Sequence, residues 1–125
     1  MFTHVLFGSN DIARSKAFYD AALGALGLEP GTDMNGRVFY RSPAGVSFGL
    51  CTPADGQPAT HANGGTLGFA AKDAASIDAF HAAGVANGGT DEGAPGPRTY
   101  MPGAYAAYMR DPDGNKICSF CILPE

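Results

Sequence analysis

The densest group of side chains that could bind a ligand lies in the last third of the chain, where one arginine stands among three tyrosines. These residues are Arg98, Tyr100, Tyr105 and Tyr108. A guanidinium can anchor a carboxylate or a phosphate through paired hydrogen bonds, and tyrosines can orient a small acidic or aromatic ligand. We therefore predict that these four residues bind substrate at the mouth of a pocket. The alternative is that the tyrosines pack on a sheet with their hydroxyls at the surface.

Cysteines suggest a second kind of chemistry, but their spacing argues against it. The chain has three, Cys51, Cys118 and Cys121, and the last two have the C-x-x-C spacing of redox and metal-binding motifs. In an extended strand, residues three apart point to opposite faces, so these two thiols could not easily share a bridge or a metal. Because the odd count also argues against a disulfide framework, we interpret the cysteines as structural thiols.

Composition and missing motifs exclude several classes of function. The net charge is −4, the pI is about 5.2 and no basic stripe is present, so nucleic acid is not an expected partner. No apolar run approaches the roughly 20 residues that span a bilayer, so no membrane partner is expected. The first residues lack a basic region followed by an apolar segment, which predicts no signal peptide and a cytoplasmic location. The motifs GxSxG, HExxH and GxGxxG and the P-loop are absent.

The elements that must position these side chains occur twice along the sequence. A shift of 62 positions aligns the two halves of the chain and gives seven identities. The matched pairs are Phe7 with Phe69, Asp11 with Asp73, Ala13 with Ala75, Ala17 with Ala79, Phe18 with Phe80, Ala21 with Ala83 and Gly27 with Gly89. Since 125 residues suit one domain of ordinary size, we predict a single domain, 1–125, built from two copies of one unit.

Each copy is predicted to begin with a strand and a helix. The first has an apolar run at 5–7, a helix N-cap at Asn10 or Asp11, and helical spacing of apolar residues over 12–26. The second has a strand over 67–71 and Asp73 as its cap. Its predicted inner helix face carries Ile77, Phe80 and Val85, and its predicted closing glycines are Gly84, Gly88 and Gly89.

After each helix the apolar pattern changes toward period two. We predict strands over 38–41 and 46–50 around a turn at 42–45, and over 105–110 and 116–122 around a hairpin turn at 111–115. Further strands are expected near 29–33 and 88–91. This divides the chain into a first module at 1–52, a linker at 53–65 and a second module at 66–125. The segment 92–103, rich in Pro and Gly, is predicted to be a long functional loop.

Two short motifs carry a resemblance to a known superfamily. One is His4-Val5 followed by Asp11, Ser15, Phe18 and Tyr19, and the other is Asp111-Pro112-Asp113-Gly114-Asn115-Lys116-Ile117. They resemble the N-terminal and C-terminal signatures of the vicinal-oxygen-chelate superfamily, which includes glyoxalases, bleomycin resistance proteins and dioxygenases. The resemblance implies an α+β fold of two βαβββ modules whose half-barrel sheets enclose a cavity.

The resemblance also implies four cavity-facing positions at which metal-dependent members place their ligands. These positions fall on His4, Gly49, Thr66 and Cys118. Gly49 has no ligand atom and Thr66 is a poor donor, so His4 and Cys118 remain. Because Cys118 stands where the resemblance implies a carboxylate, His4 is the only good ligand candidate. Because a catalytic zinc needs three good protein ligands and hard metals need oxygen donors, a divalent metal is disfavoured as the cofactor.

His4 and Cys118 are predicted as catalytic groups and Thr66 as a substrate-binding group, on the positions that the resemblance implies. For His4 the alternative is a neutral, hydrogen-bonded histidine at a strand start. For Cys118 it is a small apolar packing residue. A reactive thiolate would need a nearby positive charge to lower its pKa, and His4 could supply one if the two strands are neighbours.

The resemblance implies a glyoxalase-like enzyme acting on a small molecule in the cavity between modules, as a lyase, an isomerase or a dioxygenase. The alternative is a non-catalytic small-molecule-binding protein of the drug-sequestering type, which the depleted ligand set favours. A structural or regulatory domain without a pocket function is a third alternative. Exposed strand edges at the rim of a half-barrel favour a homodimer, in which modules pair within one chain or are exchanged between two chains.

Overall fold

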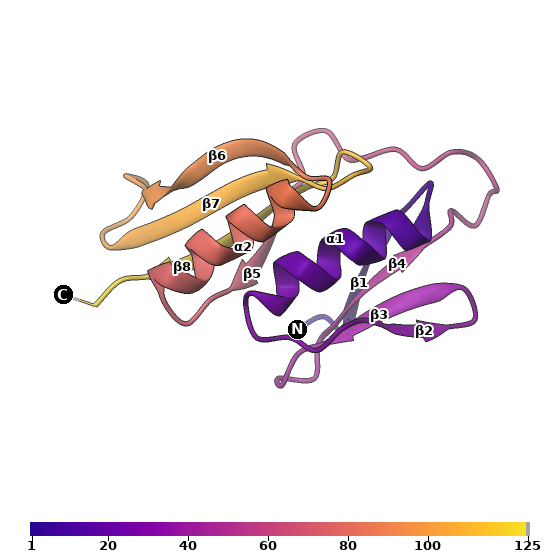
Figure 1. The fold of residues 1–125 in the computed structure, drawn as a ribbon, viewed down its shortest axis with the longest axis horizontal. Helices are drawn as coiled ribbons and strands as arrows, with labels where there is room; N and C mark the ends of the chain where they lie inside the picture. Colours follow the sequence, from indigo (N-terminus) through magenta and orange to yellow (C-terminus); the bar gives the residue numbers. More distant parts are fainter. Residues whose placement is uncertain (125) are drawn as a thin grey trace.

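The chain folds into two similar modules, each a four-stranded sheet with one helix packed against it (Figure 1). The computed structural model describes residues 1–124. The first module contains β1 (His4–Gly8), α1 (Ile12–Gly24), β2 (Thr32–Met34), β3 (Arg37–Arg41) and β4 (Ser47–Cys51). The second contains β5 (Leu67–Ala70), α2 (Ala74–Ala86), β6 (Thr90–Pro97), β7 (Ala104–Arg110) and β8 (Lys116–Ile122). This confirms the predicted α+β fold with two βαβββ modules.

The two sheets share one topology. Their strand orders are β1-β4-β3-β2 and β5-β8-β7-β6, with the first strand of each module parallel to the last and the other neighbours antiparallel. Between the first strand and its parallel partner the chain must cross over, and the helix of each module lies in that crossover. The 62-residue repeat in the sequence is therefore a repeat of the whole sheet-and-helix unit.

Aspartates start both helices, as predicted. The side chain of Asp11 accepts a hydrogen bond from the backbone N–H of Arg14 at 3.1 Å, and that of Asp73 accepts one from Ser76 at 2.8 Å. Each carboxylate satisfies one of the free N–H groups of a first helical turn. Asp11, rather than Asn10, is thus the N-cap of α1, which ends at Gly24, two residues before the predicted position.

The prediction of a long loop over 92–103 is wrong for the first half of this segment, because β6 continues to Pro97. Its pairing with β7 shifts register on both sides of Gly93, so the strand is bulged. Because β6 is an edge strand of its sheet, it can contain proline and glycine. In a central strand, the missing N–H group of proline and the weak packing of glycine would be costly.

Two predictions for α2 are also wrong. Gly84 does not close the helix but lies buried inside it. Only glycine fits there, because a Cβ atom at this position would lie 2.3 Å from Cε of Met109. Val85 does not share the inner face with Ile77 and Phe80. It is 43% exposed, whereas those two side chains are fully buried.

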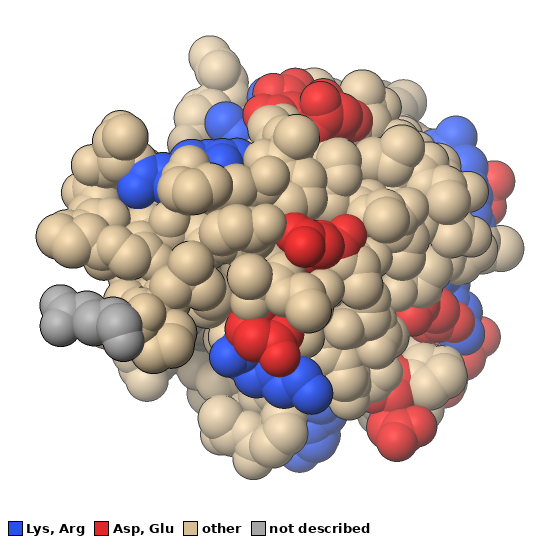
Figure 2. Space-filling view, turned by 60° about the vertical axis from the view of Figure 1, so that its left-hand side comes forward, with Lys and Arg blue, Asp and Glu red and all other residues tan. Residues whose placement is uncertain are grey.

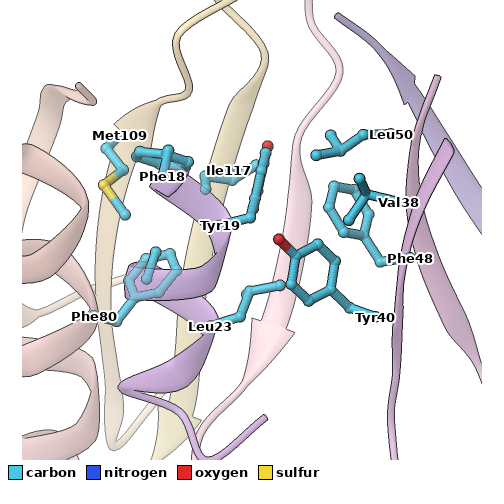
Figure 3. Close-up of a cluster of buried hydrophobic side chains, with 11 residues drawn as sticks. Phe18, Tyr19, Leu23, Val38, Tyr40, Phe48, Leu50, Phe80, Met109 and Ile117 are labelled. Atoms are coloured by element: carbon cyan, nitrogen blue, oxygen red, sulfur yellow. The ribbon is translucent and has the colours of Figure 1, made fainter. Parts of the chain in front are cut away.

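The core lies between the helices and one face of each sheet (Figure 3). In the first module Val38, Tyr40, Phe48 and Leu50 point toward α1, which contributes Phe18, Tyr19 and Leu23. The helices lie side by side, and edge-on contact between the rings of Phe48 and Phe69, 5.4 Å apart, joins the modules. Because side chains alternate along a strand, the other face of each sheet points away from this core.

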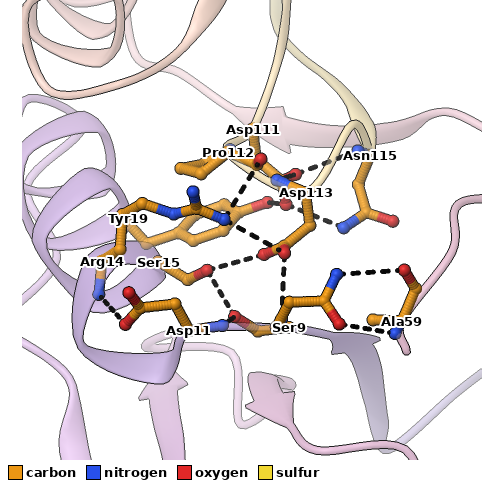
Figure 4. Close-up of polar contacts among 11 residues, drawn as sticks. Ser9, Asp11, Arg14, Ser15, Tyr19, Ala59, Asp111, Pro112, Asp113 and Asn115 are labelled. Carbon is orange, nitrogen blue, oxygen red and sulfur yellow. Dashed lines mark hydrogen bonds and ion pairs between the residues drawn. The ribbon is translucent and has the colours of Figure 1, made fainter. Parts of the chain in front are cut away.

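A buried polar network also joins the modules (Figure 4). The hydroxyl of Tyr19 on α1 donates to Oδ2 of Asp111 at 2.6 Å, and Nδ2 of Asn115 donates to the same carboxylate at 2.9 Å. Tyr19 is fully buried and Asp111 is 3% exposed, so this carboxylate is satisfied by protein donors. Burial and the neighbouring Asp111 raise the pKa of Tyr19 well above its usual value, which keeps the phenol protonated.

A relay of hydroxyls extends this network. Oγ of Ser15 donates to Oδ2 of Asp113 at 2.8 Å and, its one proton being used, accepts from Oγ of Ser9 at 2.6 Å. Ser9 in turn accepts from the backbone N–H of Asp11 at 3.2 Å. The motif from Asp11 to Tyr19 thus holds the 111–115 hairpin turn against the start of α1.

Within residues 1–124 no helix has the length and apolar character needed to cross a membrane.

Candidate ligand-binding site

The open face of the first sheet forms a pocket with a volume of about 1130 Å³. Its polar end is a row of three side chains across three strands, because Arg41 on β3 pairs with Ser47 on β4, and Ser47 with His4 on β1. Residues paired in this way point to the same face of a sheet. The pocket lining also includes Thr3, Leu6, Leu28, Glu29, Thr32, Met34, Arg37 and Phe39.

The floor of this pocket is apolar. The next row of the sheet consists of Phe39, Gly49 and Leu6, which pair with one another in register. A Cβ atom at Gly49 would lie 2.6 Å from Cδ2 of Leu6 and 2.7 Å from Cε1 of Phe39. These two side chains therefore occupy the space above Gly49, and only glycine fits beneath them.

His4 is held at the pocket edge by its neighbour. Its ring nitrogen Nδ1 lies 2.8 Å from Oγ1 of Thr3, which is hydrogen-bond distance. With Nδ1 engaged, Nε2 is the nitrogen left for another partner.

The open face of the second sheet carries Cys118 and aromatic groups. Cys118 on β8 pairs with Tyr108 on β7 and with Gly68 on β5, and it is 7% exposed. Burial raises the pKa of the Cys118 thiol, and the positive charges of Lys116 and Arg98 only partly oppose this effect. The thiol is therefore protonated at neutral pH, which does not suit a nucleophilic thiolate.

Tyr108 lies between two cations on this face. The charged groups of Arg98 and Lys116 are 5.5 and 5.4 Å from the centre of its ring. Its hydroxyl is 3.1 Å from that of Tyr100, whose own ring stacks on Phe120. The hydrogen bond with Tyr100, followed by burial, raises the pKa of Tyr108 to about 12, so the group is a neutral hydrogen-bond donor.

The predicted cluster of one arginine and three tyrosines is divided by the fold. Arg98 donates hydrogen bonds to the backbone carbonyls of Ala94 and Gly96, both at 2.9 Å, and so holds the bulged end of β6. Tyr105 lies on the helix-facing side of its strand and donates to Asp78 of α2 at 2.6 Å. Of the four, Arg98, Tyr100 and Tyr108 contribute side chains to the open face, whereas Tyr105 lies on the other side of the sheet.

The four implied metal positions do not form one site within the chain. His4 and Gly49 lie on the first sheet, Thr66 and Cys118 belong to the second module, and no second-module residue lines the pocket that contains His4. Across residues 1–124, no three His, Cys, Asp or Glu side chains gather closely enough to hold a metal. Leu6 and Phe39 also fill the space of the missing ligand at Gly49. The donor set does not fit a metal ion.

Sequence reasoning missed Arg41, Ser47 and Phe39. The signal was present in the segment Arg37–Arg41, where Val38 and Tyr40 are buried and the alternate residues must point away from the core. The alternation along one strand does not give the register between β3, β4 and β1. That register aligns Arg41 and Ser47 with His4.

Charged side chains elsewhere are scattered. Figure 2 shows one face on which acidic and basic groups stand in small separate clusters among uncharged residues. This face offers no continuous basic surface for a polyanion.

Comparison with known proteins gives a consistent result. The family model described as Glyoxalase/Bleomycin resistance protein/Dioxygenase superfamily matches residues 2–119. The crystal structure of a glyoxalase/bleomycin resistance protein from Albidiferax ferrireducens T118 is 60% identical, covers 96% of this chain and 97% of that chain, and has a TM-score of 0.89. A search of the curated proteins finds no match.

More distant solved structures share the fold alone. A glyoxalase/bleomycin resistance protein/dioxygenase family enzyme from Burkholderia phytofirmans PsJN is 18% identical, covers 97% of this chain and 98% of that chain, and has a TM-score of 0.75. A lactoylglutathione lyase from Agrobacterium tumefaciens is 22% identical over 96% of this chain and 92% of that chain, with a TM-score of 0.65.

Proposed function

The chain belongs to the glyoxalase/bleomycin resistance protein/dioxygenase superfamily, and on this premise we propose that it binds a small organic molecule on the open face of its first sheet. The observation that carries the proposal is the pocket of about 1130 Å³, with an apolar floor at Leu6 and Phe39 and a polar row beside it. Mostly apolar concavities with a few converging polar groups are the usual form of small-molecule sites.

The site is proposed to be completed by a second copy of the chain. One chain lines the pocket with first-module residues only, so the pocket stays open on the side away from the sheet. The aromatic open face of a partner's second sheet has the chemistry to cover it, and Met34 and Tyr100 are each 55% exposed in the single chain. In such a homodimer with exchanged modules, His4 of one chain and Cys118 of the other would face the same cavity.

Binding without metal chemistry is the function that these residues support best. The floor places apolar side chains where a metal-dependent member would have a ligand, and the Cys118 thiol is kept neutral by burial. These features favour a ligand-binding protein of the drug-sequestering type over the glyoxalase I and dioxygenase reactions.

A metal-independent lyase or isomerase is the second candidate. The contact between Thr3 and His4 favours it, because a histidine whose Nδ1 is fixed and whose Nε2 is free can act as a general acid or base. In this case a bound small molecule would be converted, and His4→Gln would abolish turnover because the glutamine amide cannot act as an acid or base.

A small-molecule screen by protein-observed NMR on the isotope-labelled chain, followed by mass spectrometry of each bound compound after incubation, tests both candidates. Recovery of a binder unchanged supports the binding function, and a product that His4→Gln no longer forms supports the enzyme. The proposal fails if no compound of the screen perturbs the resonances of Leu6, Phe39 or Ser47.

A further inference from the structure

Within the proposed binding function, on which this inference rests, we propose that the ligand is an amphipathic monoanion. Its negatively charged group, a carboxylate or a group of similar chemistry, lies on the row formed by Arg41, Ser47 and His4. Its apolar body, an aromatic ring or a short hydrocarbon, lies on the floor formed by Leu6 and Phe39.

The arginines of the chain differ in whether they have partners. Arg14 lies 3.5 Å from Asp113, Arg110 is paired with Glu92 at 3.0 Å, and Arg98 is held by backbone carbonyls. Within residues 1–124 neither Arg37 nor Arg41 has a carboxylate within salt-bridge distance, and both line the pocket. An exposed guanidinium without an internal partner is free to bind an anion.

Of these two arginines, Arg41 has neighbours that can complete an anion site. It is in register with the Ser47 hydroxyl, which is in turn in register with His4, so three hydrogen-bonding groups lie in one line. Arg37 instead pairs with Met34, whose side chain cannot donate a hydrogen bond. The two arginines are four residues apart on one strand, about 13 Å, so a ligand with a single small head group must choose between them.

The charge of the lining suits one negative charge. Arg37, Arg41 and Glu29 are its charged residues, which leaves one net positive charge with His4 neutral. The chain as a whole carries −4. A positive pocket in an acidic protein favours anions locally, while Glu29 opposes a second negative charge.

The floor defines the rest of the ligand. Leu6 and Phe39 are half-buried although they lie on an open face, so each keeps apolar surface that a ligand can cover. An aromatic body can meet the ring of Phe39, and covering this surface stabilises the complex in proportion to the apolar area removed from water.

Three naphthalene probes of matched shape test the charge preference by isothermal titration calorimetry. These are 2-naphthoate, neutral 2-naphthamide and the cationic 2-(aminomethyl)naphthalene. We expect 2-naphthoate to bind about tenfold more tightly than 2-naphthamide, because it adds a charge-assisted hydrogen bond, and the cation to bind most weakly. Added salt should weaken the binding of 2-naphthoate and leave that of 2-naphthamide unchanged.

Variants locate the head group. Arg41→Gln should remove the roughly tenfold preference for 2-naphthoate while leaving the affinity for 2-naphthamide as it was. Lys72→Gln removes one positive charge outside the pocket and controls for net charge, and unchanged amide NMR spectra establish that each variant is folded. If Arg37→Gln instead removes the preference for 2-naphthoate, the charged group binds at the Arg37 end of the pocket, and its assignment to Arg41 is overturned.

The two proposals fail in different ways. Equal affinity for 2-naphthoate and 2-naphthamide, both mapped to the first sheet, overturns the monoanion inference and leaves the binding function in place. Absence of binding by all three probes overturns the inference, and with it the claim that the apolar floor receives an aromatic body. The wider screen under the proposed function then decides whether the pocket binds any other class of molecule.

Discussion

Single side chains decide what the first sheet can offer to a ligand. Arg41 and Ser47 point into the pocket because Val38, Tyr40 and Phe48 on the same strands are buried on the opposite face. The alternation can be predicted from the sequence, since Arg37 and Arg41 stand at outward positions of a strand whose alternate residues, Val38 and Tyr40, are core positions. The identity of the row could not be predicted, because it depends on which residue of β4 lies beside which residue of β3.

The close packing of Leu6 and Phe39 over Gly49 can be tested by substitution. A methyl group at Gly49 would lie 2.6 Å from Leu6, so Gly49→Ala should destabilise the chain by about 1–3 kcal/mol through overpacking. Gly24→Ala is the matched control, because a Cβ atom there meets nothing within 4 Å, and it should be neutral or slightly stabilising in a helix. Urea unfolding of both variants checks this, and equal stability of the two would contradict the packing described.

Asp20 gives a pH-dependent test. Burial of its carboxylate is outweighed by hydrogen bonds from Lys16, Gly31 and Tyr40, so the pKa of Asp20 is lowered in the folded chain. A lowered pKa contributes stability that is present above the unfolded value, about 3.9, and is lost as pH falls through the folded value.

Asp20→Asn should therefore cost about 1 kcal/mol at pH 7 and progressively less below pH 4, where the wild-type carboxylate also becomes protonated. Urea unfolding at pH 7 and pH 3 measures both values, with Asp55→Asn in an exposed turn as the control. A cost that stays the same at both pH values would show that the charge of Asp20 plays no part.

At the scale of elements, hydrogen-bond partners and sheet edges explain both the successes and the errors of sequence reasoning. The helix starts were predictable because Asp11 and Asp73 act locally, within one turn. β6 was missed because its Pro and Gly content resembles a loop, and only its place at the edge of a sheet makes that content acceptable. The role of the 111–115 hairpin turn as a link to α1 depends on contacts about 90 residues or more apart in sequence, which no local pattern contains.

The link between the hairpin and α1 can be tested with one hydroxyl. Tyr19→Phe removes a buried donor to the Asp111 carboxylate and should cost about 1.5–3 kcal/mol, because a buried charge loses a partner. Tyr105→Phe removes a similar 2.6 Å hydrogen bond to Asp78 at the surface and should cost clearly less, because water can replace the lost partner. The free energies of unfolding of the two variants separate the cases, and a larger cost for Tyr105→Phe would contradict a buried link between modules.

At the scale of the whole molecule, the helices bring the modules together and leave both open sheet faces to other partners. Sequence reasoning could not decide whether His4 and Cys118 meet in one chain, because that depends on how the modules pack. The fold places them on two separate faces, and the proposed exchange of modules between chains would bring them together.

This arrangement predicts a stable homodimer. Light scattering on the eluting peak should give about twice the chain mass of 12.8 kDa, with dissociation favoured by Tyr100→Asp, which places a charge on the proposed contact face. Lys72→Asp, at an exposed site outside that face, is the control. A monomer at micromolar concentration would count against the exchange of modules.

In the proposed dimer, a small organic molecule binds between the first sheet of one chain and the second sheet of its partner. Chemical-shift mapping of the isotope-labelled protein with 2-naphthoate locates both sides of such a site. We expect the perturbed amides to include Leu6, Phe39 and Arg41 together with Tyr108 and Cys118, whose faces are separate within a single chain. Perturbation confined to the first sheet, or to other regions such as residues 53–58 of the linker, would contradict it.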